Sequence, residues 1–211
     1  GMAASLATKN NTTPRGVYEK YLPELKQLME KGVAPAPDKY WHSAQPNPSN
    51  KSARKLTPPA WLPKAGKNLA RNAKITVSGL HKTANYPATN INDGTININD
   101  NAGRWVSDEG GDLRAEPHWV ELTFPQPVEI NALRLISGQS GGATPIQDFV
   151  LQYRNGSTWT DIGGTKTESN DNPDIAKRFP TVTSSEFRLV ITATPGNLAR
   201  IWELELYYVN P

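Results

Sequence analysis

The sequence contains no cysteine. A fold held by disulfides, a zinc site built from thiolates and catalysis by a cysteine nucleophile are therefore all excluded. A chain of 211 residues without such links must be stabilised by a packed core, with or without the help of a bound metal ion. The lack of cysteine suits a cytosolic protein and equally an exported bacterial protein, and it argues against a vertebrate secreted domain.

The chain also has little net charge and no long hydrophobic run. Its net charge is +3, and the densest basic stretch, residues 51–71, is proline-rich and typical of a solvated linker. We therefore expect no nucleic-acid partner. No run of about 18 apolar residues occurs, so we expect no membrane insertion. No signal peptide is visible, but Gly1 before Met2 resembles a cloning remnant, which leaves export open.

The first 65 residues are predicted to form a polar tail, a short helical segment and a linker. Apolar residues recur at helical spacing within 14–31, which predicts one or two short helices. Residues 33–65 hold seven prolines and predict an extended linker. Trp41 and Trp61 are unusual in a free tether, so we expect at least one of them to dock on the domain that follows.

The chain changes character near residue 73, where short runs of alternating apolar and polar residues begin. Asn155-Gly156 separates two of these runs and predicts a tight hairpin, because both residue types tolerate positive φ. Many short strands without a convincing helix indicate an all-β antiparallel sandwich over residues 66–211. The predicted strands are 74–78, 119–124, 128–136, 149–153, 158–162, 187–192 and 201–208.

Six motifs in this region, taken together and in this order, resemble the discoidin domain, also called the coagulation-factor C-type domain. The resemblance covers roughly residues 66–209 and nothing before them. The motifs are NLARNAKITVS at 68–78, YPATN at 86–90, NDG at 92–94, RW at 104–105, HWVELTF at 118–124 and WELELY at 202–207.

The resemblance implies a jelly-roll, galactose-binding-domain-like sandwich whose loops bind ligands at one end. Bacterial members of this family are mostly carbohydrate-binding modules attached to glycan-degrading enzymes. Vertebrate members bind membranes or proteins and usually carry a terminal disulfide, which this chain lacks. We therefore expect a bacterial protein exported to the periplasm or the exterior, with a carbohydrate partner and a catalytic domain N-terminal to this region.

The resemblance also implies a structural calcium site. Residues 90–100 are rich in the carboxylate and amide oxygens that calcium prefers. By position in the family pattern, the expected ligands are Asp93, Asp100, Gly103 and Glu203. Gly103 stands where the family usually has threonine, and five extra residues separate the two aspartates. The alternative is a turn rich in Asn and Asp that binds no ion.

The expected ligand site lies in the loops between the predicted strands. Sugars are bound by an aromatic ring against their CH face and by planar groups that exchange hydrogen bonds with hydroxyls. His81 and Arg114 are the preferred pair, followed by Asn197. The alternative for each residue is an ordinary exposed loop position. The full set of candidates is His81, Tyr86, Arg114, Asn197 and Arg200.

The tryptophans of the predicted strands are also candidates for sugar stacking. We expect Trp105 and Trp119 to lie in the core instead. At Trp202 the family often has a small residue, so the large ring is expected to fill a gap or to contact the linker.

Nothing in the sequence indicates a self-contained enzyme. The carboxylate pairs Asp108/Glu109 and Glu203/Glu205 are not placed across a recognisable cleft, as acid–base catalysis would require. The three histidines form no zinc motif, and no nucleophile elbow occurs. The first hypothesis is therefore a non-catalytic carbohydrate-binding module for galactose-type or related glycans, which tethers an attached or partner enzyme to glycan. The alternative is a discoidin module that recognises a protein or another surface without binding sugar.

Overall fold

A computed structural model describes residues 56–63 and 67–210 of the chain. Seven strands and four short 3-10 helices make up the regular structure of this part. The predicted helical segment at 14–31 and Trp41 lie outside the described residues. The strands are β1 (Lys74–Val77), β2 (Trp105–Val106), β3 (His118–Ser137), β4 (Asp148–Asn155), β5 (Thr158–Asp161), β6 (Asp174–Ala193) and β7 (Arg200–Tyr207). The 3-10 helices are η1 (Leu69–Asn72), η2 (Ala88–Ile91), η3 (Ser140–Gly142) and η4 (Pro195–Asn197).

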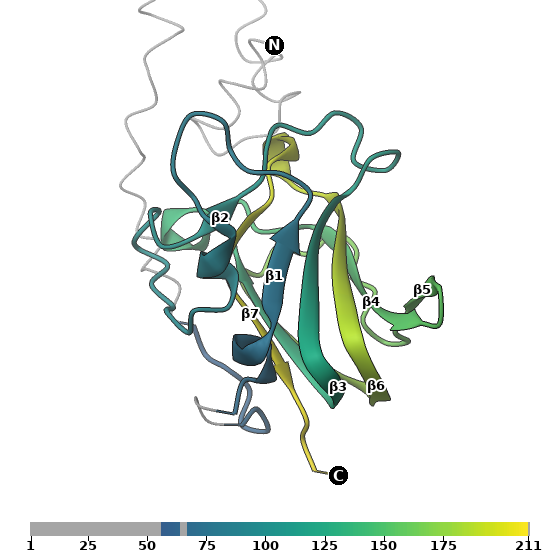
Figure 1. Cartoon of the computed structure of the whole chain (residues 1–211). Coiled ribbons are helices and arrows are strands. Elements are labelled where there is room, and N and C mark those ends of the chain that lie inside the picture. Colours follow the sequence, from purple (N-terminus) through teal and green to yellow (C-terminus); the bar gives the residue numbers. More distant parts are fainter. Residues whose placement is uncertain (1–55, 64–66, 211) are drawn as a thin grey trace, which may run out of the picture. The chain divides into compact units, whose positions relative to one another are not determined.

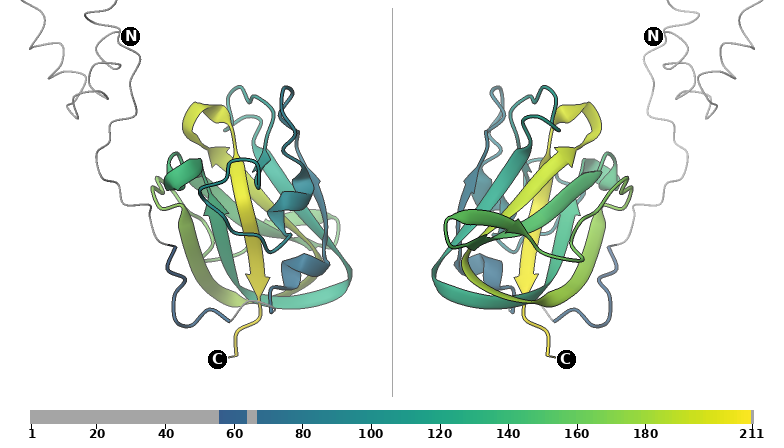
Figure 2. Two further views of the ribbon diagram at one scale, coloured as in Figure 1. Left: turned by 90° about the vertical axis from the view of Figure 1, so that its left-hand side faces the viewer. Right: turned by 90° about the vertical axis from the view of Figure 1, so that its right-hand side faces the viewer.

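All strand pairs are antiparallel, and two strands of 20 residues each, β3 and β6, belong to both layers of the fold. The first half of β3 pairs with β1 and with the end of β6, while its second half pairs with β7 and with the start of β6. The register shifts between Thr123 and Val128, where β3 bends next to two prolines. One layer is therefore β1-β3-β6-β4-β5, and the other is β2-β7-β3-β6 (Figures 1 and 2). The predicted all-β sandwich is confirmed.

The core lies between the two layers and follows the alternation of each strand. Side chains at every second position point inward and are fully buried, as Val120 and Leu122 on β3 show. Trp105 is also fully buried in this core, as predicted. The predicted hairpin joins β4 to β5, with Gly156 at φ 60°. The described residues contain no helix that is long and apolar enough to cross a membrane.

The prediction that Trp119 lies in the core is wrong. Because Val120 and Leu122 point inward, their neighbour Trp119 must point to the outer face of the same layer. There its ring lies 5.4 Å from the guanidinium carbon of Arg188, which also covers Trp159 at 4.3 Å. Trp119 is therefore half-buried on the outer face of the sheet.

Trp202 is fully buried on the outer face of the second layer, in a small apolar cluster with Ile98 and Ile136. Its indole N–H donates a hydrogen bond to the Asp100 carbonyl at 2.8 Å. Leu56, from the region predicted as linker, packs against the same cluster. Trp202 thus shares a cluster with a residue of the predicted linker, which is one of the two outcomes expected for it.

Residues 56–63, called the strap below, lie against the outer face of the second layer. Leu56 anchors one part of the strap in the Trp202 cluster. Trp61 anchors the other, since the guanidinium carbon of Arg178 lies 5.3 Å from its ring. The expected docking of a tryptophan is thus seen for Trp61, and the domain boundary predicted at residue 66 stays a prediction.

Candidate ligand-binding site at the loop end

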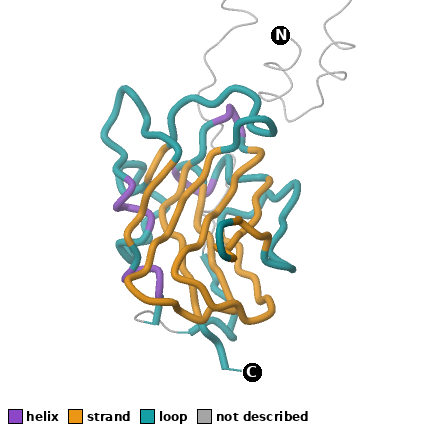
Figure 3. Tube along the Cα trace, turned by 45° about the vertical axis from the view of Figure 1, so that its right-hand side comes forward, coloured by secondary structure: helices purple, strands orange, loops and turns teal. Residues whose placement is uncertain are grey.

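The loops that join the strands gather at one end of the sandwich, the upper end in Figures 1 and 3. The loop after β1, the loop between β2 and β3, the segment after β3 and the turn before β7 all lie there. Backbone hydrogen bonds tie them together, for example from the His81 N–H to the Val106 carbonyl at 3.0 Å and from the Gly138 N–H to the Arg200 carbonyl at 3.0 Å. The loops thus form one continuous surface.

Arg104, which the sequence analysis did not select, organises one part of this end. Its guanidinium carbon lies 5.7 Å from the ring of Tyr86 and 5.6 Å from the ring of Trp202. Its Nη1 donates hydrogen bonds to the Asn101 side chain and to the Gly138 carbonyl. Burial lowers the pKa of Arg104, and the hydrogen bond with the Tyr86 side chain acts in the opposite direction. Arg104 therefore fixes Tyr86 relative to two other loops.

His81 and Tyr86, both predicted for the site, are brought together. Their rings meet edge to face with centroids 5.7 Å apart, and both side chains are half-buried. The side chain of Thr83 lies 3.3 Å from His81 Nδ1, which helps to hold the imidazole. An aromatic ring and an imidazole thus share one part of the rim, as sugar recognition requires, and the buried guanidinium of Arg104 holds the ring from within.

Arg200 lies close to this group but serves the fold. Its side chain is buried, and its Nη1 donates hydrogen bonds to the Leu198 carbonyl at 2.9 Å and to the Pro195 carbonyl at 3.3 Å. Burial lowers its pKa, and the charge of Arg104 adds to the effect. Arg200 therefore holds the turn before β7.

Asn197 and Arg114 lie on the second part of the rim. Asn197 is exposed, and its Nδ2 donates a hydrogen bond to the Gly111 carbonyl at 2.7 Å, which joins the turn before β7 to the loop before β3. Arg114 is exposed on a turn whose backbone is capped by Asp112. No contact places either residue beside His81, so the preferred pair of His81 and Arg114 stays a prediction.

His118 is a second residue that sequence reasoning did not select for the site. Only 4% of it is exposed, and its Nε2 lies 2.9 Å from the Asn197 carbonyl and 3.1 Å from Ser107 Oγ. Its Nδ1 lies 3.4 Å from Ser78 Oγ. The buried imidazole thus connects the loop after β1, the loop after β2 and the turn before β7. A lone histidine at the start of a strand gives no sequence signal for such a role.

Ser107, His118 and Asp108 resemble a catalytic triad in residue type, with 3.8 Å between His118 Nδ1 and the Asp108 carboxylate. However, Ser107 is fully buried. Its hydroxyl donates to the Asp108 carbonyl at 2.8 Å and accepts from the Ala199 N–H at 3.0 Å. A nucleophile must reach its substrate, so these contacts assign the group a structural role.

The residues predicted to hold calcium are only partly brought together. Glu203 is fully buried, and its carboxylate accepts hydrogen bonds from Asn68 Nδ2 at 3.1 Å and from the Gly94 N–H at 3.0 Å. Burial raises its pKa to about 8, and the nearby charge of Asp93 contributes to the rise. A buried carboxylate with an acidic neighbour would be stabilised by a cation, but each Glu203 oxygen already accepts a hydrogen bond, so calcium at Asp93 and Glu203 stays a prediction.

Asp100 and Gly103 lie on a neighbouring turn. The Asp100 carboxylate is exposed and accepts a hydrogen bond from the Ala102 N–H at 2.8 Å, so it caps its own turn. Within residues 56–63 and 67–210, no group of three or more His, Cys, Asp or Glu side chains is placed to hold a metal ion. Any calcium here would need backbone carbonyls from the 92–103 loop beside the two carboxylates.

Comparisons with known proteins agree with this architecture. The chain has no match among curated proteins. The solved structures that it resembles include chitosan-binding module 1 from a Paenibacillus sp. IK-5 chitosanase/glucanase (23% identity, TM-score 0.53), of which it matches 98% over 67% of its own length. The family 32 carbohydrate-binding module from Clostridium perfringens NanJ, solved with galactose, is similar at 18% identity and TM-score 0.52, over 66% of this chain and 96% of that one.

A longer protein contains a similar domain. A putative α-L-fucosidase from Bacteroides thetaiotaomicron matches 68% of this chain over 29% of its own length, with 18% identity and a TM-score of 0.55. These structural similarities support the fold. The sequence profile of the F5/8 type C domain matches residues 74–204, well over half of the chain. The chain therefore belongs to the F5/8 type C, or discoidin, domain family.

Proposed function

We propose that this chain is a carbohydrate-binding module that acts by binding and uses the loop end of the sandwich. The observation that carries the proposal is the group formed by His81, Tyr86 and Arg104, which places a half-buried ring and an imidazole on one rim and fixes the ring with a buried guanidinium. The solved relatives that bind chitosan or galactose support a sugar as the ligand class. A galactose-type sugar is the first candidate.

The module is proposed to hold an enzyme near its glycan. The similar domain within the longer fucosidase chain supports such an arrangement. A single small sugar buries little area, so one site binds weakly, and a linked catalytic domain gains through high local concentration. The glycan substrates of such enzymes lie outside the cell, so the proposal includes export from a bacterium.

The second candidate is recognition of a protein or other surface without sugar. One observation favours it: Leu80, in the loop after β1, is 53% exposed next to the His81 group. Leu80 therefore offers an apolar contact to a partner surface beside that group. Binding of a protein partner that is lost in Leu80→Ser, together with no binding to any glycan on an array, would favour this candidate.

The first prediction tests the sugar site through its aromatic ring. Tyr86→Ala is expected to weaken galactose binding about ten-fold or more, because a stacked ring contributes roughly 0.5–1.5 kcal/mol beyond the area it buries. Isothermal titration of the whole chain with galactose measures the change. Tyr208→Ala is the matched control, since Tyr208 is an exposed ring just after β7. Equal affinities for wild type and Tyr86→Ala would reject this site.

The second prediction concerns calcium, which we propose is bound by Asp93 and Glu203. Saturating calcium is expected to raise the melting temperature by about 5–10 °C over chelator, because binding to the native state alone adds roughly 2–3 kcal/mol at 100 times Kd. Glu203→Gln should abolish this rise, whereas Glu129→Gln, an exposed acid on β3, should keep it. Identical melting curves with calcium and with chelator would contradict the proposal.

A further inference from the structure

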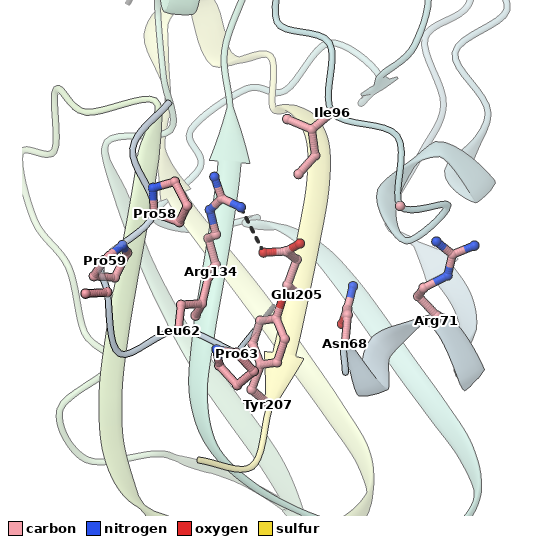
Figure 4. Close-up of a pocket in the computed structure, with 12 residues that line it drawn as sticks. Pro58, Pro59, Leu62, Pro63, Asn68, Arg71, Ile96, Arg134, Glu205 and Tyr207 are labelled. Atoms are coloured by element: carbon pink, nitrogen blue, oxygen red, sulfur yellow. Dashed lines mark hydrogen bonds and ion pairs between the residues drawn. The ribbon is translucent and has the colours of Figure 1, made fainter. Parts of the chain in front are cut away.

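The strap forms one wall of a pocket on the side of the sandwich, and none of the loop-end residues His81, Tyr86 and Arg104 lines it. The pocket lies between the strap and strands β3 and β7 and has a volume of about 420 Å³ (Figure 4). Ligand sites for small molecules typically measure roughly 300–1,000 Å³, with mostly apolar walls and a few placed polar groups. Leu56 and Trp61 anchor the strap to the sheet, so the opening has a defined wall.

The walls and the floor of this strap pocket differ in chemistry. Pro58, Pro59 and Leu62 of the strap form an apolar wall. The floor consists of Arg134, Glu205 and Tyr207, which are 7%, 6% and 1% exposed. Nearly buried charged groups at the base of an otherwise apolar pocket are the usual arrangement of a selective polar site.

The floor offers hydrogen-bond donors and an acceptor next to each other. Arg134 uses Nε and Nη2 for the carboxylate of Asp174, at 2.7 and 2.9 Å, and Nη1 for Glu205 Oε2 at 3.3 Å. A guanidinium has five N–H groups, so one hydrogen on each Nη is not used by these bonds. A carboxylate has about four lone-pair sites, so Glu205 can accept further hydrogen bonds.

The charges around the strap pocket favour a neutral ligand. Arg134 is balanced by Asp174 and Glu205, and Arg71 lines the opposite side of the opening. Arg134 is thus already paired with two carboxylates, and the charge of Glu203 acts on Arg71, so neither cation is free to bind an ionic ligand. Vicinal hydroxyls, in contrast, can each donate to a carboxylate and accept from a guanidinium. The CH groups of a sugar ring would then meet the apolar wall.

We infer that the strap pocket is a second carbohydrate site, which binds one neutral pyranose unit through the Arg134–Glu205 pair and the proline wall of the strap. This inference shares only its ligand class with the proposed function. The loop end and the strap pocket have no residue in common, so each can fail without the other. Two sites on one module would let it bind a branched or folded glycan with higher avidity than a single site.

The test is an amide-resolved NMR titration of the whole chain with galactose and, separately, glucose. The amides of Asn68 and Ile96 report on the strap pocket, and those of His81 and Tyr86 report on the loop end. At least one of the two sugars is expected to shift the strap-pocket amides in a saturable way. The inference is overturned if neither sugar shifts them.

Two variants show whether these shifts come from the pocket itself. Ala60→Trp fills the pocket from an exposed strap position, and Glu205→Gln removes the charge at the same size. Each is expected to weaken binding at the strap-pocket amides about ten-fold. Ser157→Trp, on the turn between β4 and β5, is the matched control. Unchanged strap-pocket shifts in folded Ala60→Trp would overturn the inference.

Failure of the two proposals is distinguishable in the same experiment. Tyr86→Ala should remove the loop-end shifts and keep those of the strap pocket. Strap-pocket shifts without any at the loop end would contradict the proposed function and support this inference. Loop-end shifts without any at the strap pocket would support the proposed function and overturn this inference.

Discussion

Arg104→Gln is expected to abolish measurable galactose binding at the loop end. The guanidinium of Arg104 stacks on Tyr86 and joins that loop to the Gly138 carbonyl. Its cation–π contact contributes roughly 0.5–2 kcal/mol, and hydrogen bonds to a charged group contribute roughly 1.5–3 kcal/mol. If most of this free energy holds Tyr86 in place, the affinity of the loop end for galactose falls on the order of 100-fold. The amide shifts of His81 and Tyr86 during an NMR titration with galactose measure the loss.

Arg154→Gln is the matched control for this experiment. Arg154 also stacks on an aromatic ring, 5.2 Å from Trp159, but it lies in the β4–β5 hairpin. It should therefore lose a contact of the same kind and bind galactose like the wild type. Equal loss in both variants would mean that the effect comes from general destabilisation. Unchanged binding in Arg104→Gln would show that Arg104 does not contribute to the site.

Arg134→Met is expected to lower the free energy of unfolding by about 3–5 kcal/mol. Arg134 is the shared partner of two nearly buried carboxylates, Asp174 and Glu205, and its removal leaves both without their cation. Breaking a buried ion pair on one side has roughly that cost, because an uncompensated charge stays buried. For a domain of this size, the melting temperature should fall by on the order of 10 °C. Thermal unfolding followed by circular dichroism measures the shift.

The matched control for Arg134→Met is Arg178→Met. Arg178 lies on β6, which pairs with β3, the strand of Arg134. It is exposed and contacts the ring of Trp61. Loss of an exposed cation–π contact should cost about 0.5–1 kcal/mol. A similar melting temperature for the two variants would show that the Arg134 network is not a main source of stability. It would also argue against Arg134 being held rigidly at the floor of the strap pocket.

The fold could be predicted because its signals are local. Strand alternation, the Asn155-Gly156 hairpin and the discoidin motifs all lie within short windows of sequence, and the structure confirms the sandwich that they indicate. Trp119 shows the limit of this approach. Its neighbours identify a strand, but only the choice of register decides which face carries the large ring.

The site could be predicted less completely, because it depends on contacts between distant loops. His81 and Tyr86 lie in one loop and were both selected from the sequence; the structure shows their rings in contact, and their role in binding stays a prediction. Arg104 is 18 residues after Tyr86, and Trp202 completes the stack from β7. No spacing rule links such positions. Arg200 illustrates the opposite problem, since its loop position suggested a ligand contact whereas its guanidinium binds backbone carbonyls.

The composition of the strap gave no sign that it docks on the sandwich. Its prolines predict an extended linker, and the chain there is indeed irregular, yet Leu56 and Trp61 fix it to the sheet. Proline-rich segments carry no periodicity that could reveal which side chains are buried. The strap pocket exists because the strap docks on the sheet. Since the sequence does not predict the docking, it does not predict the pocket either.

The most direct test of the central claim is to titrate galactose into the isotope-labelled chain and map the amides that respond. Saturable shifts are expected at His81, Tyr86 and their neighbours in the loop after β1, and these shifts should disappear in Arg104→Gln. Shifts confined to other parts of the sandwich, or none with galactose while a protein partner binds through Leu80, would contradict it.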